Sequence, residues 1–161
     1  MQPQDSRHEP RPVTATVVLD TNVVLALYWF QDASLGRLAH ALETGQLRWM
    51  ATSEMRQELV HVLERWQGDN AARGPRHALP PEGPSVQDVL RMFDRLAQQA
   101  TASSAGSTPR CTDSADQKFI DLALSSRSLW LLTRDRAVLK LRRKLLTIAG
   151  CTVQRPEDWQ G

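Results

Sequence analysis

The segment VVLDTNVVLAL, from Val17 to Leu27, constrains the fold more than any other part of this sequence. It begins with β-branched and apolar residues, which are typical of a central parallel strand buried on both faces. The apolar run is interrupted at Asp20 and then resumes. A buried carboxylate is costly unless it is paired or binds a metal. Asp20 is therefore expected either to cap a following helix or to face a positive charge at the end of the strand.

Segments typical of strands and of helices alternate along the rest of the chain. Strands are expected at residues 14–20, 47–52, 128–133 and 147–154. Helical spacing of apolar residues is found at residues 21–30, 34–45, 53–66, 85–100, 114–126 and 134–146. This alternation predicts an α/β fold with a mainly parallel central sheet.

Length and composition indicate one ordinary globular domain. The chain has 161 residues, of which 41% are hydrophobic and 24% charged, and a chain of this length can bury a sizeable core. Residues 1–12 are polar and contain prolines, so we expect a disordered N-terminal tail followed by a single domain at 13–161. The glycine- and proline-rich segment 67–84 is expected to be a loop, whose role the sequence leaves open.

The sequence also bears on where the protein acts. Cys111 and Cys151 lie far apart and match no spacing of zinc ligands, so we expect two reduced thiols. No apolar run is long enough to cross a membrane, and the N-terminus does not have the pattern of a signal peptide. These observations predict a cytoplasmic protein with no membrane partner.

Several acidic residues fall where a parallel sheet would gather them. Asp20 and Asp135 each follow an expected strand, and ligands bind beyond the carboxyl ends of such strands. Asp116, with Asp113 before it, begins a helix, and Glu58 lies in the helix after the second strand. Any one of these acids could simply cap a helix or face solvent. Together they would repel one another unless a divalent cation neutralised them, and oxygen ligands of this kind suit Mg²⁺ or Mn²⁺.

Four motifs in order, VVLDTNVVL, TSEMRQELVHVL, DSADQKFIDLAL and LWLLTRDRAVLKL, resemble those of the PIN-domain nucleases. The closest branch comprises toxin components of bacterial toxin–antitoxin systems (VapC-like). The resemblance extends from Val17 to Trp159. It implies a three-layer α/β/α PIN-like fold and an Mg²⁺-dependent endoribonuclease that hydrolyses RNA phosphodiester bonds. It also implies a small antitoxin protein as partner and a homodimer.

The resemblance assigns roles to residues at matching positions. The catalytic and metal-binding acids would be Asp20, Glu58, Asp116 and Asp135. Accessory positions would be Asn22, Asp113 and Thr133. The chain departs from the pattern at Gln117, where relatives often have an acid, and at Arg134, where they often have glycine.

The basic residues are concentrated between Arg127 and Lys144, where seven lysines and arginines accompany a single acid, Asp135. Such a run usually forms a solvated helix face. Beside an acidic metal site, it is better explained as a surface that contacts the phosphates of RNA. The candidate nucleic-acid-binding residues are Arg134, Arg136, Lys140 and Arg143.

Two other functions remain open. The same fold could serve as a non-catalytic RNA- or protein-binding module, although all four acids of the enzyme pattern are present. A phosphatase of the haloacid-dehalogenase type would also place an Asp at a strand end. That class requires a second Asp two residues later, where this chain has Asn22.

Overall fold

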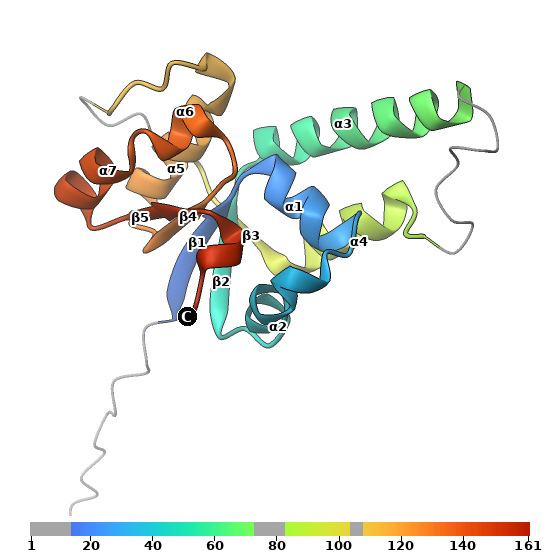
Figure 1. The fold of residues 1–161 in the computed structure, drawn as a ribbon, viewed down its shortest axis with the longest axis horizontal. Helices are drawn as coiled ribbons and strands as arrows, with labels where there is room; N and C mark the ends of the chain where they lie inside the picture. The colour runs from blue at the N-terminus through green and yellow to red at the C-terminus, as the bar shows by residue number, and fades with distance from the viewer. Residues whose placement is uncertain (1–13, 73–82, 104–107) are drawn as a thin grey trace, which may run out of the picture.

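The computed structural model describes residues 14–72, 83–103 and 108–161 (Figure 1). The N-terminal tail expected at 1–12 lies outside the described residues, as does the segment 73–82 of the loop expected at 67–84. The first part of that loop, residues 67–72, belongs instead to the helix that begins at Ser53.

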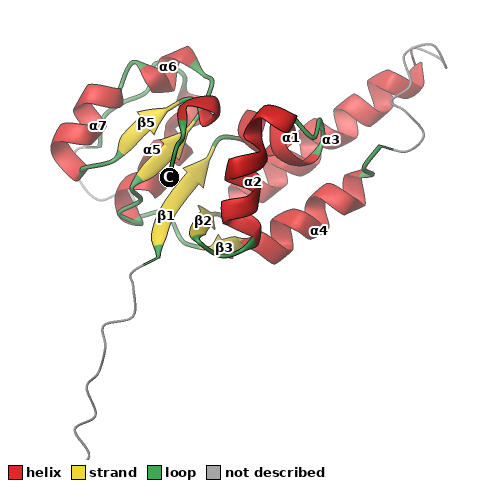
Figure 2. Cartoon of the chain, turned by 60° about the horizontal axis from the view of Figure 1, so that its bottom comes forward, coloured by secondary structure: helices red, strands yellow, loops and turns green. Residues whose placement is uncertain are grey.

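A five-stranded parallel sheet forms the centre of the molecule, with strand order β3-β2-β1-β4-β5 (Figure 2). All four pairs of neighbouring strands are parallel. The strands are β1 (Ala15–Leu19), β2 (Leu47–Ala51), β3 (Ala97–Gln99), β4 (Trp130–Leu132) and β5 (Thr152–Gln154). The prediction of an α/β fold with a mainly parallel sheet is confirmed.

Helices cover both faces of the sheet, which gives three layers (Figure 2). The α-helices are α1 (Thr21–Tyr28), α2 (Gly36–Glu43), α3 (Ser53–Ala72), α4 (Val86–Leu96), α5 (Gln117–Ser125), α6 (Arg136–Leu139) and α7 (Arg142–Ala149). Short 3-10 helices occur at η1 (Ala33–Leu35), η2 (Ser114–Asp116) and η3 (Pro156–Asp158). The fold is the three-layer α/β/α architecture that the motifs implied.

Helices α3 and α4 extend side by side beyond the sheet (Figure 1). Arg56 of α3 and Asp94 of α4 join them through two short hydrogen bonds, 2.6 and 2.7 Å long. At its start, α4 has a capping box, in which Ser85 and Asp88 exchange side-chain and backbone hydrogen bonds. The predicted helix at 85–100 is therefore confirmed up to Leu96, after which the chain turns into β3.

The core is built around β1, which lies between β2 and β4. Val17 and Val18 are completely buried, as expected for a strand covered on both faces. On one side of the sheet, the Trp49 ring of β2 packs edge-on against Phe93 and stacks on Tyr28. This aromatic cluster joins α1 and α4 to the sheet that carries the candidate site.

Further segments differ from the sequence predictions. The strand expected at 147–154 is reduced to β5, because residues 147–149 belong to α7. Strand β3 is three residues long and falls where the pattern predicted the end of a helix. The helix expected at 134–146 is divided into α6 and α7, with Lys140 and Leu141 between them.

Both cysteines, Cys111 and Cys151, are free thiols, as predicted. Within the described ranges, no helix combines the length and apolar character needed to cross a lipid bilayer.

Candidate active site

The predicted acids meet at one edge of the sheet, because the carboxyl ends of parallel strands share an edge. Asp20 directly follows β1, and Asp135 comes after the neighbouring strand β4. Glu58 belongs to α3, which begins after β2 on the other side of β1. Asp116 lies in the same place, since its carboxyl is affected by the charges of Asp20 and Asp135, and Asp113 lies near Asp116.

Asp20 is buried, with only 3% of its surface exposed. Its Oδ1 accepts a hydrogen bond from the backbone N–H of Asn22 at 3.2 Å, so Asp20 does cap α1. Its Oδ2 accepts a second hydrogen bond from the Thr133 hydroxyl at 2.7 Å. Burial raises the pKa of Asp20 above its usual range despite these bonds, and the charges of Asp135 and Glu58 raise it further.

Thr133 links the two strand-end acids. It is fully buried, donates to Asp20, and accepts a hydrogen bond from the backbone N–H of Asp135 at 2.9 Å. Asp135 in turn caps α6 by accepting from the N–H of Ala137 at 2.6 Å. Capping and a role in the site are compatible here, because each carboxylate oxygen has more than one lone pair.

Asp116 carries the clearest sign of crowded negative charge. Burial and the charges of four neighbouring acids raise the pKa of Asp116 to about 6. Among the described residues, none donates a hydrogen bond to its carboxylate. The neighbouring acids, in order of decreasing effect, are Asp20, Asp135, Asp113 and Glu58. The Asp116 carboxylate thus faces an excess of negative charge that no described side chain compensates.

The fourth acid, Glu58, is engaged by neighbouring elements. Its Oε1 accepts a hydrogen bond from the Thr21 hydroxyl at 3.1 Å, and its Oε2 forms an ion pair with the ammonium group of Lys118. Sequence reasoning did not identify Lys118. Its place one residue after Gln117, at the start of an amphipathic helix, gave no signal that its charge would turn toward the acids.

No group of three or more His, Cys, Asp or Glu side chains in the described ranges could hold a metal ion as it stands. Caps and pairs already engage carboxylate oxygens of Asp20, Asp135 and Glu58. The donor set nevertheless fits a divalent cation. It consists of carboxylate oxygens. The pKa values of Asp20 and Asp116 are raised mainly by burial and further by the charges of neighbouring acids, and a bound cation would offset both effects.

The remaining sequence-predicted positions differ in their surroundings. Asn22 is exposed at the start of α1, and Asp113 caps η2 through the N–H of Ala115. Gln117, which replaces an acid of the motif, instead fastens the preceding loop. It accepts from the N–H of Cys111 and donates to the carbonyl of Pro109. This departure therefore has a structural role.

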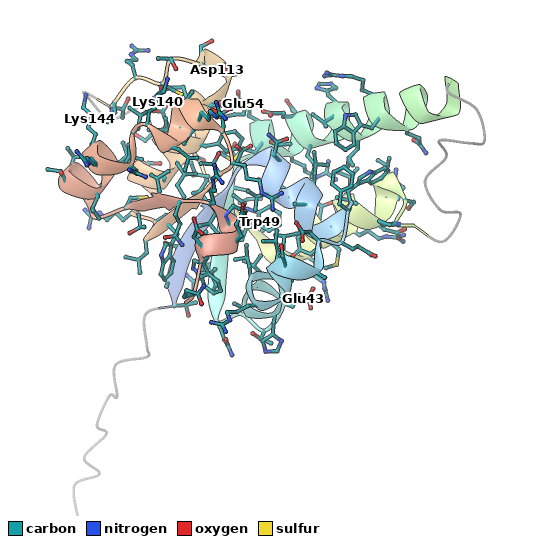
Figure 3. All side chains as sticks on the ribbon, in the orientation of Figure 1. Glu43, Trp49, Glu54, Asp113, Lys140 and Lys144 are labelled. Carbon is teal, nitrogen blue, oxygen red and sulfur yellow. The ribbon has the colours of Figure 1, made fainter. Side chains whose placement is uncertain are left out.

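The basic residues lie close by, on α6, on α7 and at Lys140 between the two helices. Arg136, Lys140 and Arg143 are exposed and, with Leu139 and Arg142, line a shallow hollow of about 400 Å³. Figure 3 shows Lys140 and Lys144 in the same upper-left part of the view as Asp113, whereas Glu43 lies at the bottom.

Arg134 differs from these residues, because two acids already compensate its charge. Its guanidinium pairs with Asp32 at 3.2 Å and with Glu157 at 3.1 Å. These pairs tie the residue before Asp135 to the segments before η1 and within η3.

The comparison with known families agrees with this architecture. A family model described as the PIN domain matches residues 16–137, which include Asp20, Glu58, Asp113, Asp116 and Asp135. The chain belongs to the PIN-domain family, whose members are generally nucleases that use divalent metal ions. No curated protein matches the chain.

The raised pKa values make a prediction about pH. In the folded protein Asp116 binds its proton up to about pH 6, whereas the ordinary value is 3.8. Between these pH values the folded state binds more protons than the unfolded state, so stability falls as the pH rises. The metal-free protein is expected to melt at a lower temperature at pH 7.5 than at pH 5.

This expectation can be checked by thermal denaturation in EDTA, with Asp116→Asn as the comparison. Asp88 and Asp94 work in the opposite direction, since their pKa values are lowered by hydrogen bonds. The stability that these two acids contribute is lost mainly below pH 5, outside the range compared here. The variant should show a smaller change in melting temperature between pH 5 and 7.5. An equal change in both proteins would show that Asp116 does not have the raised pKa.

Proposed function

We propose that this protein is an Mg²⁺-dependent endoribonuclease, with Mn²⁺ as an alternative ion. The single observation that carries the proposal is the gathering of Asp20, Asp116 and Asp135 at one edge of the sheet, where burial first, and then the charges of neighbouring acids, raise the pKa values of Asp20 and Asp116. A purely structural set of helix caps would not require carboxylates to be so crowded. Such crowding is common where acids bind a cation or exchange protons.

Each acid has a defined place in the proposed chemistry. Asp20, Asp116 and Asp135 would hold the cation, with Glu58 beside them. When bound, a divalent cation supplies an activated water and neutralises charge on the phosphate oxygens. Thr133 orients Asp20 through its hydroxyl and fixes the backbone of Asp135. Burial of Asp20 excludes bulk water from one side of the site.

RNA is the proposed substrate because a cationic surface adjoins the acids. A polyanion that approaches an acidic site needs neighbouring positive charge, and the exposed residues Arg136, Lys140 and Arg143 provide it. Arg134 is the weakest candidate of the predicted four, since its two ion pairs compete with phosphate. The proposed RNA therefore crosses α6 and α7 on its way to Asp135.

A triple variant, in which Arg136, Lys140 and Arg143 are each replaced by Gln, is expected to bind single-stranded RNA more weakly. Its binding should also depend less on salt concentration. For three lost phosphate contacts, the slope of log K against log salt should decrease by roughly 2. Fluorescence anisotropy between 50 and 200 mM salt measures both effects, in an Asp20→Asn background to prevent cleavage. Arg91→Gln with Arg95→Gln on α4 is the control and should change neither. An unchanged slope in the triple variant would show that these three residues do not contact RNA phosphates.

The activity itself is tested with labelled single-stranded RNA and the purified full chain. The reactions contain Mg²⁺, Mn²⁺, EDTA, or EDTA followed by excess Mg²⁺. Internal cleavage that EDTA stops and Mg²⁺ restores supports the proposal. RNA binding without cleavage under all conditions would favour a non-catalytic binding module.

We extend the proposal to a cytoplasmic toxin of a toxin–antitoxin pair, on the basis of the resemblance of the four motifs. In this role a small antitoxin would cover the acidic edge and insert a basic side chain, and two copies of the chain would form a homodimer. Growth arrest on expression in bacteria, absent with Asp20→Asn, tests this role separately from the activity.

A further inference from the structure

Lys118 is a nearly buried cation among the acids of the candidate site. It is the second residue of α5, and its side chain is only 14% exposed. Its ammonium group pairs with Glu58, donates to the carbonyl of Ala115 at 2.8 Å, and lies 5.3 Å from the centre of the Phe119 ring. The surrounding groups thus hold the charge in one place. Among the ion pairs of the described segments, only this one involves an acid of the proposed catalytic set.

Both carboxylate oxygens of Glu58 have partners. Oε2 faces Lys118, and Oε1 accepts from the Thr21 hydroxyl. Thr21 directly follows Asp20, and Lys118 lies two residues after Asp116. Glu58 therefore joins the segments that carry two of the other acids, while its own charge is already compensated.

We propose that Lys118 is a positioning residue that acts as a built-in counter-ion for Glu58. It leaves Asp20, Asp116 and Asp135 as the acids available to a divalent cation. It also holds α5 and its preceding acid against α1 and α3. This inference rests on the proposed function and narrows it, because it removes Glu58 from the metal-ligand set.

Charge substitutions at Lys118 and Glu58 distinguish a counter-ion role of Lys118 from a role of Glu58 as a metal ligand. If Lys118 compensates Glu58, its removal leaves a free carboxylate beside three others. The metal-free fold then loses stability, because a partly buried charge has lost its partner. A divalent cation is bound more tightly, because the number of ligand charges sets affinity. If Glu58 is instead a ligand in its own right, removing Glu58 weakens cation binding whether or not Lys118 is present.

A double-mutant cycle separates these possibilities. The full-length variants are Lys118→Met, Glu58→Gln and the two together, with Arg91→Met as a control that removes an exposed ion pair with Asp88. Mn²⁺ affinity is measured by calorimetry, and melting temperature is measured in EDTA. Neither readout depends on cleavage.

Lys118→Met is expected to lower the metal-free melting temperature and to bind Mn²⁺ about tenfold more tightly. Glu58→Gln alone should weaken Mn²⁺ binding, because an unpaired ammonium group then faces the acids. The double variant should return to within about threefold of the wild-type affinity, since both charges of the pair are gone. Arg91→Met should change neither quantity. The double variant still tests the inference if Lys118→Met alone fails to fold.

Two results would overturn the inference while leaving the proposed function intact. One is a double variant that binds Mn²⁺ as weakly as Glu58→Gln, which would make Glu58 a ligand. The other is unchanged Mn²⁺ affinity in Lys118→Met with weakened RNA binding, which would place Lys118 on the substrate phosphate. A wild-type protein that binds no Mn²⁺ would overturn the proposed function and this inference with it.

Discussion

Asp20→Asn is expected to abolish RNA cleavage without unfolding the protein. Asp20 would be a direct ligand of the cation, and loss of even an indirect partner of a metal ligand costs about 10–100-fold, so a decrease in rate of at least about 100-fold is expected. The amide of Asn retains an oxygen that can accept from the N–H of Asn22 or the Thr133 hydroxyl. It also removes a buried charge that repels Asp135 and Glu58. The melting temperature should therefore be unchanged or higher.

The measurement compares initial cleavage rates and melting curves of the wild type and the variant. Asp158→Asn in η3 is a matched control, because it makes the same chemical change at an exposed acid that does not contribute to the raised pKa of Asp116. It should cleave at the wild-type rate. Cleavage by Asp20→Asn at a rate close to that of the wild type would exclude Asp20 from the active site.

Phe93→Ala is expected to cause a large loss of stability. The Phe93 side chain is 2% exposed, and its ring centre lies 4.8 Å from that of Trp49 on β2. Removing a buried aromatic side chain typically costs about 3–5 kcal/mol in the free energy of unfolding, from lost burial and the cavity that remains. The total free energy of unfolding of a typical domain is only about 5–15 kcal/mol. Urea denaturation should therefore show a greatly lowered midpoint.

Phe30→Ala is the control for this prediction. Phe30 is 53% exposed and packs on Trp66 at the surface, so the same truncation removes little buried area. We expect it to cost less than about 1 kcal/mol. Equal losses in the two variants would show that α4 is not part of the cooperative core. That result would also remove the basis for treating the sheet and the α3–α4 extension as one unit.

Local patterns predicted the parts of the fold that are buried on both faces. The β-branched run before Asp20 became the central strand, and the apolar residues of LWLL became its neighbour β4. Strand β3 could not be predicted in this way. Gln98 and Gln99 are exposed, so the strand has no apolar alternation, and it exists because its backbone pairs with β2. The division between α6 and α7 is likewise invisible in a run of leucines and basic residues.

The sequence predicted those parts of the candidate site that the order and direction of the strands bring together. Once the strands are parallel, acids that follow adjacent strands must share an edge, as Asp20 and Asp135 do. The partners of long side chains do not follow from topology. Lys118 and Arg134 reach acids that are distant in sequence, Glu58 and Asp32, and spacing along the chain contains no information on those contacts.

The central claim is that Asp20, Asp116 and Asp135 bind a divalent cation together. The measurement that tests it most directly is the anomalous difference density of Mn²⁺ in crystals of the full-length protein. The account predicts a peak enclosed by the carboxylates of these three residues, with Glu58 still paired to Lys118. A saturated crystal with no peak at this edge of the sheet, or with its Mn²⁺ bound elsewhere, would contradict it.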